Sequence, residues 1–224
     1  MEVYPVINAP DYATVERNLR TIRSFLPPNG WIHVDIADAK FTPHKTWNDP
    51  RSWANLKSNF NIEVHLMVED VEHETAAWVG AGAKRIIVHY EALIDQRYRG
   101  IQKRLEDRLQ DILNICFKEK AELFFAVNPE TPVGTLIPYF KKCAGVQTLA
   151  VYPGLAGQKF QPLVIDKISF LRKALPDVKI ELDGGVTPEV ARRAKEAGAD
   201  IVVSSSYLLK HSNPKQAYEE LRNA

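Results

Sequence analysis

Residues 31–41 read WIHVDIADAKF, an apolar run that ends in acid. Successive side chains of a strand point to opposite faces, so His33 and Asp35 project to one side and their aliphatic neighbours project to the other. An imidazole and a carboxylate are therefore held side by side where a strand ends. A histidine oriented by an acid explains this stretch taken alone, so the rest of the chain decides whether the pair is structural or functional.

Seven further β-rich runs alternate with segments of helical period. The eight predicted strands are residues 3–7, 31–36, 62–68, 85–90, 122–127, 146–152, 178–183 and 200–205. Apolar residues between them are spaced three and four apart, as in 101–115, and Thr187-Pro188 and Asn213-Pro214 are typical helix starts. Alternation without a linker or low-complexity segment predicts an α/β protein with a single (β/α)8 TIM barrel over residues 1–224. A doubly wound open sheet is the alternative.

The composition limits the classes of partner. A chain of 224 residues with 45% hydrophobic residues suits one barrel, which often has roughly 200–250 residues. Lys and Arg (29) nearly balance Asp and Glu (28), so we expect neither nucleic acid nor a membrane as partner. The two cysteines, Cys116 and Cys143, are predicted to be free thiols inside helices. Without a signal-like start or a long apolar run, a soluble cytoplasmic protein is expected.

Polar residues gather at the predicted strand ends, where barrels of this class place their sites. These residues are Asn8, His33, Asp35, His65, His89, Glu91, Asn128, Tyr152, Asp183 and Ser204–Ser206. Two histidines and two carboxylates, from three different strands, are plausible ligands for one divalent ion such as Zn, Fe, Mn or Co. They are His33, Asp35, His65 and Asp183. Spacing alone is weak evidence for this set.

Glycine-rich loops follow the last three predicted strands. YPGLAGQKF (152–160), DGGV (183–186) and SSS (204–206) are neighbours in a barrel. Glycines let backbone N–H groups approach an anion, and the loops after strands seven and eight often bind phosphate. The alternative is that these glycines only turn the chain.

Six segments, in order and over nearly the whole chain, resemble the ribulose-phosphate 3-epimerase family. They are HVDIADAKFTP, EVHLMVED, IIVHYEA, AVNPETPV, VYPGLAGQKF and ELDGGV. The resemblance implies a metal-dependent (β/α)8 barrel that interconverts D-ribulose 5-phosphate and D-xylulose 5-phosphate. It implies one divalent ion on His33, Asp35, His65 and Asp183, with Asp35 and Asp183 as acid and base. It also implies phosphate or substrate contacts from Asn8, Met67, Gly154, Gly157, Gly184, Gly185, Ser205 and Ser206, and a homo-oligomer is expected.

Inverting a carbon beside a carbonyl explains these residue types. One carboxylate removes a proton from one face, another returns a proton to the opposite face, and a metal ion stabilises the enediolate between the two steps.

Several positions depart from the family's pattern. Ala37 and Leu149 stand where methionines are expected, and Ala39 stands where a glycine is expected. The segment 92–120 is longer than usual, and its Arg97 and Arg99 belong to a lid, a solvated loop or a subunit contact. Two alternatives therefore stay open: an epimerase of another ketose phosphate, such as a six-carbon one, or a non-catalytic sugar-phosphate-binding barrel.

Overall fold

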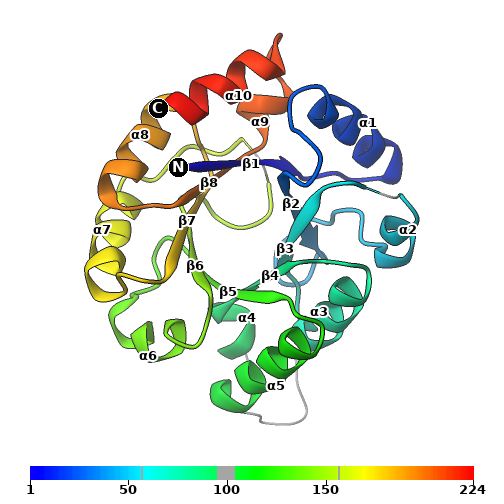
Figure 1. Ribbon diagram of the computed structural model, residues 1–224. Helices are drawn as coiled ribbons and strands as arrows, with labels where there is room; N and C mark the ends of the chain where they lie inside the picture. The colour runs from blue at the N-terminus through cyan, green and yellow to red at the C-terminus, as the bar shows by residue number, and fades with distance from the viewer. Residues whose placement is uncertain (57, 95–103, 156) are drawn as a thin grey trace.

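The computed structural model describes residues 1–56, 58–94, 104–155 and 157–224, and its eight strands close into one parallel barrel (Figure 1). The strands are β1 (Glu2–Ile7), β2 (Trp31–Ala37), β3 (Asn61–Met67), β4 (Arg85–His89), β5 (Glu122–Val127), β6 (Gly145–Leu149), β7 (Lys179–Asp183) and β8 (Ile201–Ser204). Each strand pairs with the next along the chain, and β8 pairs with β1. The predicted barrel is confirmed, and the open doubly wound sheet is wrong.

All eight predicted strands are present, and their ends differ by a few residues. The largest difference is at β6, which was expected to run to residue 152 but ends at Leu149. The Ala150 N–H donates to the Asp183 carbonyl at 2.7 Å, and the Ala150 carbonyl accepts from the Gln161 N–H at 2.9 Å. These bonds turn the chain out of the barrel and into the loop that crosses its mouth.

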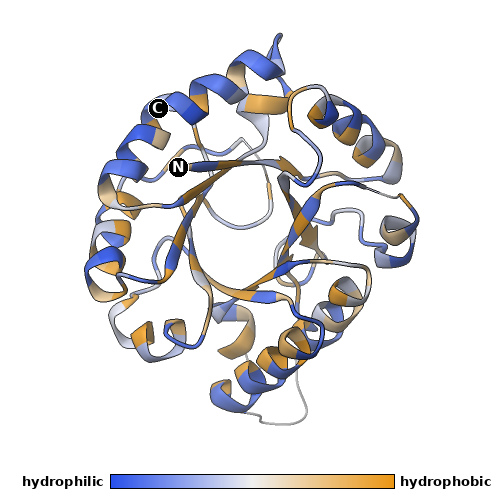
Figure 2. Ribbon diagram, viewed as in Figure 1, coloured by the Kyte–Doolittle hydropathy of each residue, from blue (hydrophilic) through white to orange (hydrophobic). Residues whose placement is uncertain are grey.

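Helices cover the outside of the barrel, and the ribbon coloured by hydropathy shows hydrophobic residues along the helix faces toward the strands (Figure 2). They are α1 (Tyr12–Arg23), α2 (Pro50–Asn55), α3 (Val71–Gly80), α4 (Tyr90–Ile94), α5 (Leu105–Lys118), the 3-10 helix η2 (Gly134–Leu136), α6 (Ile137–Phe140), α7 (Val164–Ala174), α8 (Pro188–Ala197), α9 (Ser206–Leu209) and α10 (Pro214–Asn223). The two predicted helix starts are confirmed. Thr187 Oγ1 accepts from the Val190 N–H, and Asn213 Oδ1 accepts from the Gln216 N–H.

The apolar core has two parts, because alternate strand residues face in and out. The larger part lies between the strands and the helices and includes Ile32, Val34 and Ile36 of β2. A smaller cluster lies inside the barrel: Tyr4, Val6, Ile87, Phe124, Ala126, Leu149, Ile201 and Val203. His33 and Asp35 share the inner face of β2, as period two predicts.

Both cysteines are free, as predicted, and both are buried, which raises the pKa of each thiol to about 12. Cys116 lies in α5, but the expected helical position of Cys143 is wrong. Helix α6 ends at Phe140, and Cys143 follows in a turn closed by its own N–H donating to the Phe140 carbonyl at 3.0 Å.

The long segment after β4 is anchored by a buried arginine. Arg108 Nη1 donates to the carbonyls of Ala92 and Leu93, both at 2.8 Å. Its Nε and Nη2 donate to the Glu72 carboxylate at 2.9 and 3.0 Å, which joins α5 to α3 and to the end of α4. Arg97 and Arg99 lie outside the described residues, so a lid, a solvated loop and a subunit contact all stay open as predictions.

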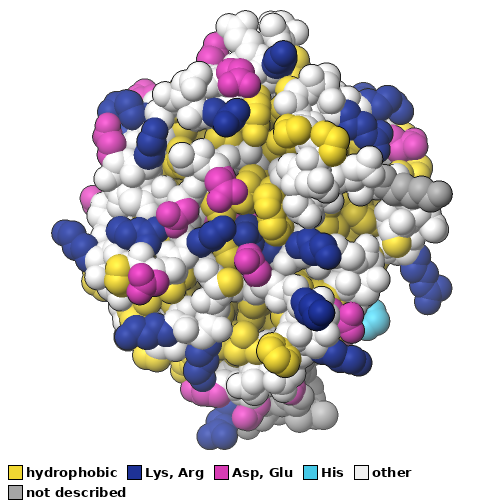
Figure 3. All heavy atoms as spheres, in the orientation of Figure 1, with side chains coloured by type: hydrophobic (Ala, Val, Ile, Leu, Met, Phe, Trp, Pro, Cys, Tyr) yellow, Lys and Arg dark blue, Asp and Glu magenta, His cyan; other side chains and the backbone are white. Residues whose placement is uncertain are grey.

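The face shown in Figure 3 carries interspersed basic and acidic side chains, without a broad patch of one sign. This pattern agrees with the formal net charge of +1. Among the described residues, no helix has the length and apolar character that crossing a bilayer requires.

Candidate active site

A pocket opens at the carboxyl ends of the strands and encloses about 530 Å³, its open mouth included. Among the described residues, its wall is formed by Val6, Asn8, Asp35, His65, Met67, Leu149, Val151, Tyr152, Pro153, Gly154, Leu155, Gly157, Asp183, Gly184, Gly185, Val186, Val203 and Ser204–Ser206. Every site residue expected from the sequence is in this wall except His33. That histidine is fully buried directly below.

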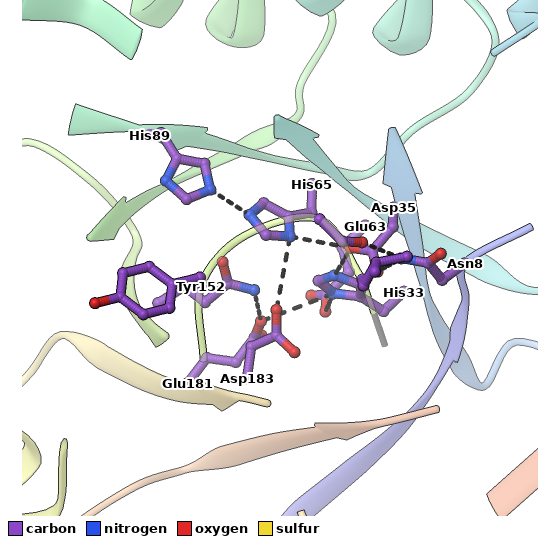
Figure 4. A network of polar contacts seen from close by, with 12 residues as sticks. Asn8, His33, Asp35, Glu63, His65, His89, Tyr152, Glu181 and Asp183 are labelled. Atoms are coloured by element: carbon purple, nitrogen blue, oxygen red, sulfur yellow. Dashed lines mark hydrogen bonds and ion pairs between the residues drawn. The ribbon is translucent and has the colours of Figure 1, made fainter. Parts of the chain in front are cut away.

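The four expected metal ligands converge at the bottom of the pocket (Figure 4). One donor atom from each of His33, Asp35, His65 and Asp183 lies within 4.8 Å of the others. Asp35 Oδ1 lies 3.1 Å from His33 Nε2 and 3.0 Å from His65 Nδ1. Asp183 Oδ2 lies 3.7 Å from His65 Nδ1. Strands β2, β3 and β7 thus aim two nitrogens and two carboxylates at one point.

The two aspartates differ in acidity although they share a site. Burial raises the pKa of Asp183 to about 6, with a further contribution from the negative charge of Asp35. Burial also acts to raise the pKa of Asp35, but hydrogen bonds from His33 and His65 outweigh it and hold that pKa well below its usual range. In the metal-free protein Asp35 is therefore the stronger acid of the two.

Asn8 connects the acid on β2 to the loop after β6. Its Nδ2 donates to Asp35 Oδ2 at 2.8 Å and to the Gly154 carbonyl at 3.0 Å. The side chain therefore orients Asp35 and holds the pocket wall at the same time. Asn8 lies in the pocket wall, and its expected contact with substrate stays a prediction.

Glycines and serines that follow β7 and β8 form another part of the pocket wall. Gly184 and Gly185 have φ values of 105° and 65°. A Cβ on Gly184 would lie 2.6 Å from a Val151 methyl, so this glycine is required for the turn as well as for close approach to a ligand. Ser205 and Ser206 face the same space.

A layer of polar residues that sequence reasoning missed lies beneath the pocket. His33 Nδ1 is 2.8 Å from Glu63 Oε1, and Arg85 Nη1 donates to Glu63 Oε2 at 2.6 Å. Gln147 Nε2 donates to Glu181 Oε1 at 3.0 Å, and burial raises the pKa of Glu181 well above its usual value. A signal was present, because Glu63 lies two residues before His65 in an otherwise apolar strand.

A second chain of contacts leads outward from His65. Its Nε2 lies 2.7 Å from His89 Nε2, and His89 Nδ1 lies 3.3 Å from Glu91 Oε2. Glu91 Oε1 accepts from the Asn128 N–H at 2.9 Å and from the Thr131 hydroxyl. The sequence placed His89, Glu91 and Asn128 at strand ends but assigned them no role.

The departures from the family pattern lie in different surroundings. Leu149 is in the pocket wall, whereas Ala37 is buried and is not among the described residues that line it. The Ala37 N–H donates to Thr46 Oγ1 at 2.9 Å. Ala39 has a φ of 63°, in the left-handed region that glycine adopts without strain.

Comparisons with known proteins agree with this geometry. Residues 2–209 match the profile described as the "Ribulose-phosphate 3 epimerase family". The "Ribulose-phosphate 3-epimerase" of Schizosaccharomyces pombe is 28% identical over 228 residues, which cover 100% of this chain and 93% of the relative. That of Chlamydia muridarum is 36% identical over 186 residues, covering 80% of this chain and 76% of the relative.

Solved structures support the fold alone. A crystal structure of 3-hexulose-6-phosphate synthase from Salmonella typhimurium superposes with a TM-score of 0.72 at 10% identity, covering 100% of this chain and 97% of that one. The family assignment rests on the profile match over almost the whole sequence and on these relatives, and not on the shared architecture. The chain belongs to the ribulose-phosphate 3-epimerase family and is an isomerase of the epimerase class.

Proposed function

We propose that this protein is a metal-dependent ribulose-phosphate 3-epimerase that interconverts D-ribulose 5-phosphate and D-xylulose 5-phosphate. The observation that carries the proposal is the convergence of His33, Asp35, His65 and Asp183 on one point of the pocket floor. Glycine and serine loops line the same pocket, where a phosphate at the other end of a short sugar would lie.

The four residues fit a divalent cation. Imidazole nitrogens and carboxylate oxygens are ligands that Zn, Fe, Mn and Co all accept. The buried Asp35 and the half-buried Asp183 lie close together, and no lysine or arginine is among the described residues of the pocket wall. A cation at this point would offset their repulsion. When bound, it would act as a Lewis acid that stabilises negative charge developing on the substrate oxygens.

Asp35 and Asp183 would carry the protons. Epimerisation at C3 needs a base that removes the proton from one face and an acid that returns a proton to the other. The carboxylates reach the pocket from different strands, β2 and β7, so one can lie on each side of the substrate. In the reverse reaction the two residues exchange roles.

The remaining pocket residues would bind and enclose the sugar. Asn8 keeps Asp35 in place, and Met67 and Leu149 provide apolar surface that limits access of water to the reacting carbon. The loops with Gly184, Gly185, Ser205 and Ser206 would hold the phosphate through backbone N–H groups and hydroxyls.

Solvent deuterium exchange tests the proposal directly. Metal-loaded protein in D2O is mixed with ribulose 5-phosphate, and the C3 proton is followed by NMR. We expect deuterium at C3 of both pentulose phosphates, and no exchange by an Asp35→Asn variant.

The two alternatives predict other outcomes of the same experiment. Exchange into a six-carbon ketose phosphate but not into ribulose 5-phosphate would show that the substrate is the larger sugar. Binding of both sugars without exchange would identify a non-catalytic sugar-phosphate binder. The homo-oligomer stays a prediction, and sedimentation of the purified protein would test it.

A further inference from the structure

Two carboxylates outside the proposed metal site each hold a histidine ring from behind. Glu63 is fully buried beneath His33, and Glu91 lies beside His89, which in turn contacts His65. Each carboxylate accepts on its second oxygen as well: Glu63 from Arg85 at 2.6 Å, and Glu91 from the Asn128 N–H at 2.9 Å. The Arg85 guanidinium and the Asn128 N–H can only donate, so each carboxylate accepts on one oxygen and offers the other to a histidine ring.

The contact with Glu63 decides which nitrogen of His33 keeps its proton. Its Nδ1 is 2.8 Å from Glu63 Oε1, an acceptor, so Nδ1 carries a hydrogen and donates it. The other nitrogen, Nε2, points at Asp35 Oδ1, 3.1 Å away. When a cation lies among the four ligands, the lone pair of Nε2 is therefore the one that faces it.

Glu91 fixes the hydrogen of His65 in the same way, but indirectly, through the ring of His89. Glu91 accepts from His89 Nδ1, and the His89 tautomer with its hydrogen on Nδ1 has its lone pair on Nε2. His89 Nε2 is 2.7 Å from His65 Nε2, and this pair needs one hydrogen between them, which must come from His65. When a cation lies among the four ligands, the His65 nitrogen that lacks a hydrogen is then Nδ1, which faces Asp35 Oδ1 at 3.0 Å.

We propose that Glu63 and Glu91 are positioning residues that fix the protons of His33 and His65 so that both rings present a lone pair to the metal site. The inference rests on the proposed metal-dependent function and adds to it two residues that do not touch metal or substrate. Partners of this kind fix the tautomer and orientation of a ligating ring, and their loss typically weakens metal binding by about 10–100-fold.

Glu91→Gln is the sharpest test, because glutamine has nearly the same shape but only one acceptor atom. The amide oxygen is needed by the Asn128 N–H, so the NH2 group faces His89 Nδ1. His89 must then accept on Nδ1 and donate from Nε2 to His65. His65 would keep its hydrogen on Nδ1, the nitrogen that faces Asp35, and lose its ability to bind a cation there.

Two measurements detect this change in the positions of the imidazole hydrogens, and neither depends on catalytic turnover. Calorimetric titration of the metal-free protein with Zn²⁺ gives the affinity, and long-range ¹⁵N–¹H correlation of the imidazoles gives the tautomers in the zinc-loaded protein. We expect wild type to show hydrogen on His65 Nε2 and His89 Nδ1. Glu91→Gln should bind Zn²⁺ about 10–100-fold more weakly and show hydrogen on His89 Nε2. Glu119→Gln, at the exposed end of α5, removes the same charge and should match wild type.

A double-mutant cycle separates this effect from simple loss of a nearby negative charge. In a His89→Phe background, Glu91→Gln should change zinc affinity less than about twofold, because the ring that transmits its effect is gone. A full-sized effect in that background, or wild-type affinity and tautomers in Glu91→Gln, would overturn the inference.

Glu63→Gln provides an independent variant if Glu91→Gln does not fold. Arg85 requires the amide oxygen, so the NH2 group faces His33 Nδ1 and the same weakening of zinc binding is expected. Unchanged zinc affinity in a folded Glu63→Gln protein would overturn the role of Glu63. If the wild type itself failed to bind Zn²⁺, Mn²⁺, Fe²⁺ or Co²⁺, the proposed metal dependence would be wrong. A metal-binding wild type with unaffected variants would refute only the positioning role.

Discussion

In the metal-free protein the ionised Asp183 carboxylate lowers the free energy of unfolding. We therefore expect Asp183→Asn to make that protein more stable at pH 8. Burial and the charge of Asp35 raise the pKa of Asp183 from 3.8 to about 6. The folded state thus binds this proton more tightly than the unfolded state does. The contribution of Asp183 to the free energy of unfolding is highest below pH 3.8, falls as the pH rises, and levels off above about pH 6.

The size of the effect follows from that difference. Each pKa unit corresponds to about 1.4 kcal/mol, so a shift of roughly two units destabilises the folded protein by about 3 kcal/mol at pH 8 and by about half of that at pH 5. Asparagine cannot ionise and nearly matches aspartate in shape, so it removes this penalty. We expect a gain of about 1–3 kcal/mol at pH 8, which corresponds to a rise in Tm of several degrees for a chain of this length.

Urea unfolding in the presence of a chelator, at pH 5 and pH 8, measures this gain. Asp177→Asn, on an exposed turn, is the matched control and should change stability little at either pH. Adding Zn²⁺ should reverse the order of stability, because wild type gains binding energy that Asp183→Asn largely lacks. A metal-free Asp183→Asn protein that is less stable than wild type at pH 8, or a difference that is the same at both pH values, would refute the reasoning.

Three further predictions concern other elements. Asp35→Asn should lower kcat by at least about 10²-fold in steady-state assays, and a near-normal rate would remove Asp35 from the chemistry. Ala39→Gly should raise the urea midpoint by relieving a left-handed alanine, a gain of about 0.5–1 kcal/mol, and a lower midpoint would contradict the strain argument. Arg108→Lys should cost about 3 kcal/mol in unfolding free energy, because a lysine cannot hold Glu72 and two carbonyls together. Unchanged stability and amide exchange at residues 90–94 would show that this anchor is dispensable.

The parts of the site that could be predicted are those where a strand ends. Asp35 and Asp183 follow apolar runs, and a closed parallel barrel leaves only one mouth at which such ends can meet. Strand order and alternation were therefore sufficient to bring residues from β2, β3 and β7 together. The resemblance to a family then assigned their chemistry.

Residues inside the strands were harder to place. Glu63 and Arg85 lie in runs whose other residues are typical of an apolar core. The local pattern does not show that the Arg85 guanidinium carbon lies 4.1 Å from the centre of the Phe124 ring, or that Arg85 donates to Glu63. Their pairing is a property of the closed barrel, in which inward-facing side chains of several strands share one layer. The predicted helical position of Cys143 was wrong for a different reason. Helix α6, which precedes it, is only about one turn long, and the residue at which such a short helix ends depends on tertiary contacts.

The pairing of β8 with β1, in which Ile201 lies opposite Glu2, also has a consequence for synthesis on the ribosome. The first strand emerges long before its partner, and until then both β1 and β7 present unpaired backbone edges. Parallel contacts between such distant parts of a chain form slowly. Asn8 and Asp35 are likewise translated well before Asp183 and Ser205. The pocket therefore cannot form, even in part, until nearly the whole chain has been synthesised. We therefore expect a chain that stops before residue 200 to aggregate or be degraded, with no fraction of the activity retained.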